Sequence, residues 1–312
     1  MSAKQWLGAL VFYGRFAPSF TAIGYRIRRL RWPRLTTDFR GQRWLVTGAS
    51  GGLGAAVAEA AAAAGAEVLA AARNETKLAA LPSGITRRVC DFSLLAEVDR
   101  FVDECASAGR RFDVLVNNVG VLATRHALTV EGHETSYVTN LLSHYALTEG
   151  LIARGVLGGS PRRSLVINVS SGGAYTVPLS VASLDIRSSG LFNGTAAYAY
   201  HKRAQIVLGA HWQRRHGAAG VDVHVMHPGW VDTAGVQGSL PSFRRWWWPL
   251  LRDAHAGVDT ILWLAAARPV PVTEEAMWFD RALRPAHVFS LTQQSSDTPE
   301  ALVRHLEQDR RR

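Results

Sequence analysis

The feature that most limits the fold is an alternation of short apolar runs with helical stretches, beginning near residue 43. The apolar runs predict strands over 44–47, 67–72, 86–90, 113–116, 164–170, 221–227 and 276–279. Between them the sequence predicts helices over 53–64, 75–80, 94–108, 141–153, 198–216 and 254–267. Strands that alternate with helices are typical of a parallel sheet covered on both faces. The pattern therefore predicts a doubly wound α/β fold.

The 312 residues suit one large domain, and the predicted organisation has three parts. A basic and aromatic N-terminal extension (1–40) precedes the main domain (41–280), and a tail with a helix (281–312) follows. Residues 1–43 hold nine Lys and Arg against Asp38 alone, which gives 9 − 1 = +8 of the total charge of +10. Because the main domain is nearly neutral, the high net charge does not indicate a nucleic-acid partner.

Cysteine content and the length of the apolar runs indicate the expected cellular location of the protein. Only Cys90 and Cys105 occur, without metal-ligand spacing, which favours a reducing compartment and no bound metal. No run approaches the ~18 to 20 apolar residues that span a bilayer. The expected location is cytoplasmic, with membrane association as the alternative.

A glycine-rich segment, Thr47-Gly-Ala-Ser-Gly-Gly-Leu-Gly54, lies between the first predicted strand and the following helix. Backbone N–H groups at a helix N-terminus can hold a pyrophosphate there. Gly48, Gly52 and Gly54 would let the chain turn and approach the phosphates closely. An ordinary glycine-rich turn is the alternative.

The ends of the next strands carry residues that distinguish cofactors. Arg73 stands where an acidic residue would favour NAD, and a guanidinium suits a 2′-phosphate. A solvated surface arginine is the alternative for Arg73. Asp91 is positioned for an adenine edge, and it also suits the N-cap of the following helix.

Amides, a phenol and an ammonium complete the candidate site. Asn117, Asn118 and Gly120 follow the fourth strand, where amides can bridge strand ends. Asn140 lies within an otherwise apolar helix, which fits a functional amide and a buried structural one equally well. Tyr198 and Lys202 are four residues apart, so on a helix they share one face.

In this order these motifs, with Ser171 and Pro228-Gly229, resemble those of the short-chain dehydrogenase/reductases over about residues 41–280. The glycine spacing matches the one-domain branch, and the long interval from Ser171 to Tyr198 is similar to that of retinol-dehydrogenase-like enzymes. The resemblance implies a Rossmann fold and a hydride transfer between nicotinamide and an alcohol or carbonyl substrate.

The resemblance also implies roles for individual residues. Ser171 would bind the substrate oxygen and Tyr198 would exchange its proton. Lys202 would lower the pKa of Tyr198 and bind the nicotinamide ribose, and Asn140 would hold a water next to Lys202. The implied cofactor is NADP, with NAD as the alternative, and the implied contacts are Gly48, Ser50, Gly52, Leu53, Gly54, Arg73, Asp91, Phe92, Asn118, Gly120, Tyr198, Lys202, Pro228, Gly229, Val231 and Thr233.

Two segments interrupt the alternation, and we expect them to form the substrate wall. Residues 172–197 predict a loop, and residues 234–253 predict an inserted lobe or lid. The tryptophans at 246–248 suggest a lid over a bulky apolar substrate, with a membrane contact or an oligomer contact as alternatives. Neighbouring His201 and His227 are expected to be packed or surface histidines.

The N-terminal extension joins aromatic residues of 6–16 to an arginine cluster at 26–34. Packing on the domain is favoured, and peripheral binding to an anionic bilayer is the alternative. A homo-oligomer is compatible with the sequence. The rivals to an oxidoreductase are a nucleotide-binding scaffold with little turnover and a lipid-binding protein.

Overall fold

The computed structural model describes residues 14–159 and 162–311, and its centre is an eight-stranded sheet in the order β3-β2-β1-β4-β5-β6-β7-β8. The strands are β1 (Arg43–Thr47), β2 (Glu67–Ala72), β3 (Thr86–Val89), β4 (Val114–Asn117), β5 (Ser164–Val169), β6 (Val221–Met226), β7 (Ala276–Phe279) and β8 (Ala282–Pro285). All neighbours from β3 to β7 are parallel, and β8 pairs antiparallel with β7. The predicted doubly wound sheet is confirmed, and β8 is an addition to the predicted strands.

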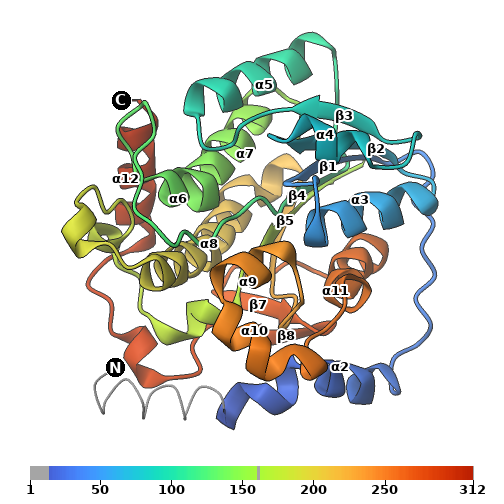
Figure 1. Cartoon of the computed structure of the whole chain (residues 1–312). Coiled ribbons are helices and arrows are strands. Elements are labelled where there is room, and N and C mark those ends of the chain that lie inside the picture. The colour runs from blue at the N-terminus through green and yellow to red at the C-terminus, as the bar shows by residue number, and fades with distance from the viewer. Residues whose placement is uncertain (1–13, 160–161, 312) are drawn as a thin grey trace.

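Side chains of each strand alternate between two cores, one on each face of the sheet. Leu45 and Leu115 belong to one core, whereas Trp44 and Val46 belong to the other. The first core is covered by α5 (Leu95–Ser107), α7 (Ser143–Ala153), α8 (Gly194–His216) and α12 (Pro299–Arg310). The second is covered by α3 (Gly52–Ala63), α4 (Glu75–Ala79) and α11 (Ala254–Ala267), so helices enclose the sheet (Figure 1).

Two helices near the candidate site begin earlier than predicted. The helix predicted from residue 141 starts as α6 (Thr135–Tyr137), continues through a π-helical turn over Val138–Leu142, and only then becomes α7. Helix α8 begins at Gly194, because Asn193 accepts the Ala196 N–H at 3.0 Å and caps it. The interval between Ser171 and Tyr198 therefore contains a full turn of α8 and is shorter as a loop than predicted.

The predicted lobe consists of α9 (Ala234–Ser239), α10 (Pro241–Trp247) and a 3₁₀ turn (Trp248–Leu250). The loop after β5 contains three further 3₁₀ turns, over Gly172–Thr176, Val181–Ser183 and Ser189–Leu191. Both predicted irregular segments are thus short helical turns joined by extended chain.

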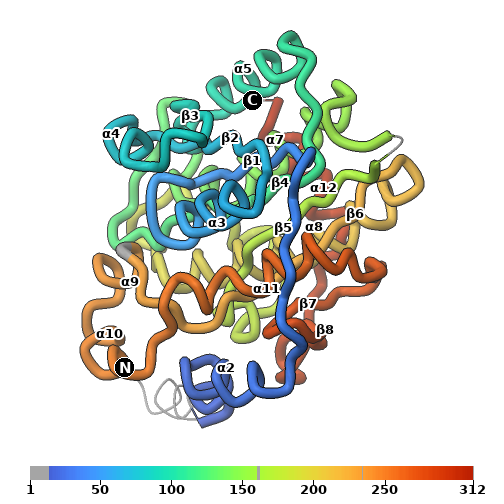
Figure 2. The backbone as a smooth tube through the Cα atoms, turned by 90° about the vertical axis from the view of Figure 1, so that its right-hand side faces the viewer, coloured from blue at the N-terminus to red at the C-terminus, as the bar shows by residue number. Residues whose placement is uncertain are grey.

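The N-terminal segment is helical over residues 14–20 and again in α2 (Ala22–Arg29), and an extended stretch then leads to β1 (Figure 2). Phe16 and Phe20 are buried in a third core with Tyr175 and Phe279. This part of the extension packs on the domain, as favoured from the sequence. The aromatic residues at 6–13 lie outside the described residues. No helix in the described ranges has the length and apolarity needed to cross a bilayer.

Candidate active site

The carboxyl ends of β1 and β4 are joined by one hydroxyl and one amide. The Thr47 hydroxyl accepts the N–H groups of Asn118 and Val119 at 3.0 and 3.1 Å. The Asn118 amide donates back to the Thr47 carbonyl at 2.9 Å. Next to them, the Asn117 amide donates to Asn168 at 2.9 Å, which links β4 to β5. The predicted bridging of strand ends by the two asparagines is present in the structure.

The glycine-rich segment packs directly against this junction. A Cβ on Gly54 would overlap the carbonyl oxygen of Gly48 and lie 2.6 Å from the Asn118 amide nitrogen. Gly48 itself has φ +67°, a conformation that favours glycine. Helix α3 begins at the exposed Gly52, and its N-cap, Gly51, provides no side-chain acceptor. The first N–H groups of α3 are therefore available to bind an anion such as a pyrophosphate.

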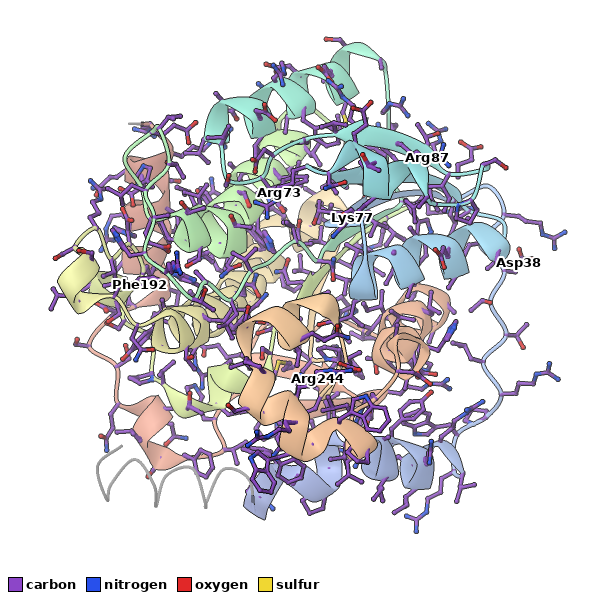
Figure 3. The ribbon with its side chains drawn as sticks, in the orientation of Figure 1. Asp38, Arg73, Lys77, Arg87, Phe192 and Arg244 are labelled. Atoms are coloured by element: carbon purple, nitrogen blue, oxygen red, sulfur yellow. The ribbon has the colours of Figure 1, made fainter. Side chains whose placement is uncertain are left out.

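The three residues predicted to contact the adenosine end of a cofactor differ in exposure and in the groups available for binding. Arg73 is exposed just beyond β2, before Asn74, which caps α4 by accepting the Lys77 N–H at 2.8 Å (Figure 3). Asp91 accepts from the N–H and hydroxyl of Ser93, at 2.9 and 2.7 Å. Phe92 is buried against Phe101 in the core, so only its backbone could contact a cofactor.

The prediction of Asp91 as a helix N-cap is wrong. The N-cap of α5 is Leu94, which provides no side-chain acceptor. The Glu131 carboxylate instead accepts the first N–H groups of the helix, from Leu95 at 2.9 Å and Ala96 at 3.0 Å. A distant glutamate therefore does what the local sequence assigned to Asp91.

Tyr198, Lys202 and Ser171 come together at the ends of β5 and α8. The Lys202 ammonium nitrogen lies 5.5 Å from the centre of the Tyr198 ring. Burial raises the pKa of the Tyr198 phenol, and the neighbouring Ser171 hydroxyl opposes this rise. The Ser171 oxygen accepts the Gly173 N–H at 3.3 Å, and the Ser171 side chain also forms a hydrogen bond with the Tyr198 phenol. The pKa of Tyr198 is thus raised in this structure, whereas the resemblance implies that Lys202 lowers it.

Lys202 is buried, and burial lowers its pKa to about 7. Its ammonium donates to the Val169 carbonyl at 2.8 Å and to the Gln205 side-chain oxygen at 3.2 Å. The Gln205 amide donates in turn to the backbone carbonyl of Asn140 at 2.7 Å. Gln205 therefore connects Lys202 to Asn140 through protein atoms. Sequence analysis missed it, although its position three residues after Lys202 puts it on the same helical face.

Asn140 sits in the π-helical turn and is fully buried. Its side chain exchanges two hydrogen bonds with the backbone of Val121, at 2.7 and 2.8 Å. A Cβ on Gly120 would lie 3.3 Å from the Asn140 side-chain oxygen and 3.6 Å from the Lys202 nitrogen. Gly120, Asn140 and Lys202 thus surround one point beside the carboxyl end of β4.

Two buried histidines, which the sequence did not assign to the site, support these residues. His201 lies 3.3 Å from the Asn140 amide nitrogen, and its other ring nitrogen lies 2.9 Å from the Leu184 carbonyl. His144 contacts Gln205 at 3.1 Å. Burial lowers the pKa of His201 to about 4 and that of His144 to about 3. His201 is packed, as predicted, but it also touches the candidate site.

The segment after β6 is held by a buried arginine. Arg252 donates to the Pro228 carbonyl at 3.2 Å and to both oxygens of Asp280 at 2.6 and 2.9 Å. Gly229, at φ +83°, leaves the space that the Arg252 side chain fills. Arg252 also donates to the Phe20 carbonyl at 2.9 Å, so the N-terminal segment is tied to the Pro228-Gly229 turn.

The lobe meets the glycine-rich segment through three other predicted residues. Thr233 caps α9 by accepting the Val236 N–H at 3.3 Å, and its side chain lies 3.6 Å from a Cβ placed on Gly52. Leu53 and Val231 both approach Gly257 of α11 so closely that a Cβ there would overlap them. Thr233, Leu53 and Val231 therefore lie where the glycine-rich segment meets the lobe and α11.

The predicted substrate segments enclose the loop that follows Gly120. The Ser239 hydroxyl donates to the Leu122 carbonyl at 2.8 Å, and Phe192 packs edge-on against His126, with ring centres 5.4 Å apart. Trp246 and Trp248 are 76% and 57% exposed, and their role as a lid over a substrate stays a prediction. Within the described lobe, Phe243 and Trp247 pack on Trp230 instead.

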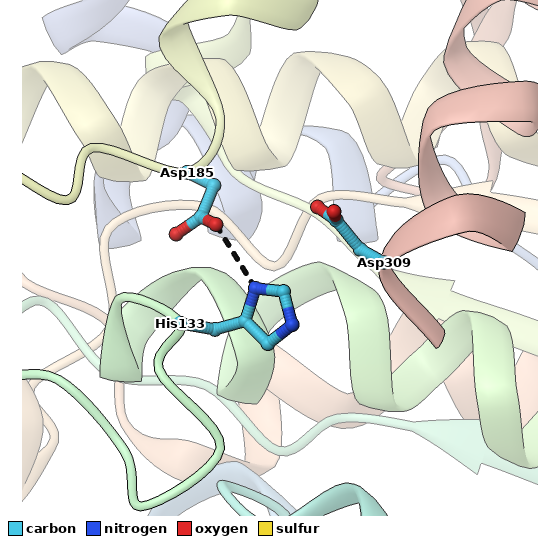
Figure 4. Close-up of side chains that lie close together, drawn as sticks. All are labelled: His133, Asp185 and Asp309. Carbon is cyan, nitrogen blue, oxygen red and sulfur yellow. Dashed lines mark hydrogen bonds and ion pairs between the residues drawn. The ribbon is translucent and has the colours of Figure 1, made fainter. Parts of the chain in front are cut away.

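A separate cluster, His133, Asp185 and Asp309, has ligand atoms within 4.8 Å of one another (Figure 4). The Arg187 guanidinium lies among them, 2.6 Å from Asp185 and 3.7 Å from Asp309, and supplies the positive charge that a metal would bring. Burial alone would raise the pKa of Asp185, but hydrogen bonds from Glu134, His133 and Arg187 lower it. The cluster therefore ties the loop before α8 to α12.

Comparison with known proteins agrees with this geometry. The short chain dehydrogenase family model matches residues 42–242. Dehydrogenase/reductase SDR family member 12 of Bos taurus is 34% identical over 89% of this chain and 89% of its own length, and the Homo sapiens protein is 33% identical over 88% of each. Human polyprenol dehydrogenase is 31% identical over 61% of this chain and 60% of its own.

Solved structures share the fold. A protein from Mycobacterium paratuberculosis superposes with a TM-score of 0.68 at 26% identity, over 88% of this chain and 95% of its own. A protein from Beutenbergia cavernae, solved with NADP bound at low occupancy, has a TM-score of 0.57 at 25% identity, over 75% of this chain and 94% of its own. The chain therefore belongs to the short-chain dehydrogenase/reductase family and is an NAD(P)-dependent oxidoreductase.

Proposed function

We propose that the protein transfers a hydride between NADP and an apolar alcohol or carbonyl substrate, with Tyr198 as the proton donor or acceptor. The observation that carries the proposal is the meeting of Tyr198, Lys202 and Ser171 beside Gly120. When bound, the nicotinamide would supply the hydride for carbonyl reduction or accept it in alcohol oxidation. The Tyr198 hydroxyl would pass its proton to the oxygen of a carbonyl substrate, and the ionised phenolate would accept one from an alcohol.

The other residues would position these groups. Ser171, which forms a hydrogen bond with the Tyr198 phenol, would donate to the oxygen of a bound substrate. Lys202 would hold a charge near the phenol, stabilise its ionised form and bind the ribose hydroxyls. Asn140 and Gln205 would fix Lys202 through the hydrogen bonds between them.

The test of this mechanism is Tyr198→Phe, assayed by NADPH oxidation with a panel of carbonyl compounds. We expect turnover to fall about 10²- to 10⁴-fold while NADPH binding, measured by fluorescence, changes little. Because Tyr198 as a whole is only partly buried and its ring would be kept, the fold should survive. A wild-type protein that binds NADPH and reduces none of the panel would support a scaffold instead.

The preference for NADP rests on Arg73. Its guanidinium is exposed beyond β2, and the sequence Ala72-Arg73-Asn74 has no carboxylate where NAD enzymes bind the ribose hydroxyls. The NADP bound in the Beutenbergia cavernae structure is consistent with this choice. A charge-assisted hydrogen bond to a 2′-phosphate would contribute roughly 1.5–3 kcal/mol.

Arg73→Gln tests that preference. We expect the KM for NADPH to rise about 10- to 100-fold and the KM for NADH to stay unchanged. Arg87→Gln is the matched control, because the Arg87 guanidinium on the neighbouring strand already donates to the Leu81 and Pro82 carbonyls (Figure 3). Equal effects of Arg73→Gln on both cofactors would contradict the proposal.

The apolar substrate is inferred from the segments around the loop after Gly120. Val121, Leu122 and Phe192 are half-buried there, and the lobe closes on the loop through Ser239. Relatives named for polyprenol and retinol, both apolar alcohols, include human polyprenol dehydrogenase and human retinol dehydrogenase 13, which is 28% identical over 73% of this chain and 72% of its own.

A series of aldehydes of increasing chain length tests the substrate class. Each buried methylene contributes about 0.8 kcal/mol, so kcat/KM should rise about fourfold per added carbon until the site is filled. Phe192→Ala should reduce this gain. A flat series, or a preference for the shortest polar aldehydes, would contradict an apolar site.

A further inference from the structure

Helix α2 presents an apolar stripe to solvent. Ile23, Ile27 and Leu30 are spaced by four and three residues, so they share one face of the helix. They are 49%, 57% and 86% exposed. A surface helix normally turns such a face toward the core, and α2 is oriented the other way.

Polar contacts on the opposite face of α2 fix this orientation. Gly24 packs so tightly on the backbone of Pro18 and Ser19 that a Cβ would overlap it. The Tyr25 hydroxyl donates to Asp259 at 3.3 Å, and the Arg28 guanidinium donates to Asp280 at 2.7 Å. Rotating the helix to bury its stripe would break both contacts, so the exposure of the stripe is built into the fold.

Positive charge borders the stripe along one flank and follows it at the end of the helix. At 100° per residue, Arg26 and Arg29 lie on one side of the stripe, and Arg31 comes just after the helix, which ends at Arg29. All three side chains are exposed, and within the described ranges none of them makes an ion pair. An apolar strip bordered by arginines is the composition of a helix that lies in the surface of an anionic bilayer.

The neighbouring lobe adds aromatic residues to the same end of the molecule. Figures 1 and 2 both show α10 beside the N-terminal helices, at the end where α2 lies. Trp246 and Trp248 of this lobe are exposed, and Arg245 lies over the Trp246 ring at 5.8 Å. Tryptophan favours the boundary between lipid headgroups and acyl chains.

We propose that the exposed stripe of α2, together with the exposed Trp246 and Trp248 of the lobe at the same end of the molecule, docks the protein on an anionic lipid bilayer. Three aliphatic side chains make too small a patch for a stable interface with a second copy, which needs on the order of 1,200 Å² or more. A bilayer accepts shallow insertion of a single stripe, and each arginine near an anionic surface contributes about 1 kcal/mol. This docking does not depend on the proposed reaction.

Co-sedimentation of the full chain with vesicles tests the proposal. We expect binding to phosphatidylcholine vesicles that contain phosphatidylserine, weak binding to phosphatidylcholine alone, and loss of binding at high salt. Ile23→Asp with Ile27→Asp should weaken binding about tenfold or more. The matched control is Val130→Asp with Val270→Asp, which changes the charge equally at apolar residues that are 93% and 85% exposed elsewhere.

Thermal unfolding and NADPH oxidation with a water-soluble aldehyde should be the same for both double variants, because all four positions are exposed. The proposal is overturned if the stripe variant binds as tightly as the control, or if the wild type binds neither vesicle. It is also overturned if the stripe variant only converts a dimer to a monomer, since the stripe would then contact a second copy.

Discussion

The two halves of the sheet are stabilised by different kinds of interior. Residues 41–120, all described, carry the glycine-rich segment and bury only three polar side chains, Thr47, Ser93 and Asn117, and no charged one. The rest of the domain buries Lys202, Arg252, Asp280 and other ionisable groups. All eleven histidines also lie outside residues 41–120.

The difference follows from what each half does. A dinucleotide can be bound mainly by backbone groups and a helix terminus, so the cofactor half can be built from apolar strands and small residues. Proton exchange needs ionisable side chains, and these must be fixed by burial and hydrogen bonds. We infer that buried charged groups lower the stability of the second half, and that they are present because the candidate site needs them.

Acid should destabilise the protein through this second half, with the largest effect of any perturbation considered. Burial lowers the pKa of His144 and His227 to about 3 and that of His201 and His224 to about 4. In the unfolded chain these groups titrate near ~6.5. Between those values the unfolded chain binds more protons, so the free energy of unfolding falls as pH falls, by roughly 1.4 kcal/mol per histidine for each pH unit.

Urea unfolding measured from pH 7 down to pH 5 gives the proton uptake directly from its slope. We expect the slope near the lower limit to approach about four protons, one from each of these histidines. An uptake below one proton would mean that the histidines stay accessible to protons in the folded state.

Arg252→Met should cost roughly 3–5 kcal/mol of unfolding free energy, because it leaves the Asp280 carboxylate buried beside one remaining arginine, Arg28. Arg88→Gln in the cofactor half is the control: Arg88 pairs with Glu104, and both side chains are about two-fifths exposed, 40% and 41%. That change should cost at most about 1 kcal/mol. Chemical denaturation of both variants measures the two losses of unfolding free energy. Equal losses would show that the two halves do not differ in this respect.

Gly54→Ala tests the cofactor half, where backbone packing matters more than charge. The new methyl group would overlap the Gly48 carbonyl, so we expect a loss of about 1–3 kcal/mol and weaker NADPH binding. Gly51→Ala should change little, because a Cβ there meets no atom within 4 Å. Calorimetric titration with NADPH compares them, and a harmless Gly54→Ala would show that the loop can relax.

Gln205→Leu should have the smallest effect, roughly a tenfold loss of kcat. It removes an acceptor that stabilises the charged form of Lys202, so the pKa of Lys202 should fall further. The alkaline limb of the kcat profile should then move to lower pH, which a purely structural substitution would not cause. Gln205→Glu provides an acceptor again and should move the limb back.

Much of the fold was predictable because its signals are local. The strand at 67–72 and the helix at 254–267 have the bounds that apolar periodicity predicted. The predicted start of the helix at 141 was wrong, because the chain is already helical from Thr135 and widens into a π turn at Asn140. Strand β8 carries few buried side chains, so its pairing with β7 left no apolar signal.

For the candidate site, the sequence spacing predicted which residues face one another. It did not predict which other side chains hold them in place. Tyr198 and Lys202 are neighbours because four residues make one helical turn. Gln205 and the contact of His201 with Asn140 were missed, because a glutamine or histidine on a helix becomes informative only when its partner is known. The lid role of Trp246 and Trp248 stays a prediction, because an aromatic run does not reveal which of its side chains meets a ligand.

The sequence by itself determined the doubly wound sheet, the glycine-rich cradle and the order of the candidate catalytic residues, because each depends on groups a few positions apart. Only the tertiary structure decided the direction of α2, whose arginine and tyrosine meet Asp280 and Asp259 more than two hundred residues away, with separations of 252 and 234. Contacts between residues so far apart leave no periodic pattern in the sequence from which they could be predicted. The exposure of the apolar stripe of α2 is therefore a property that only the folded protein reveals.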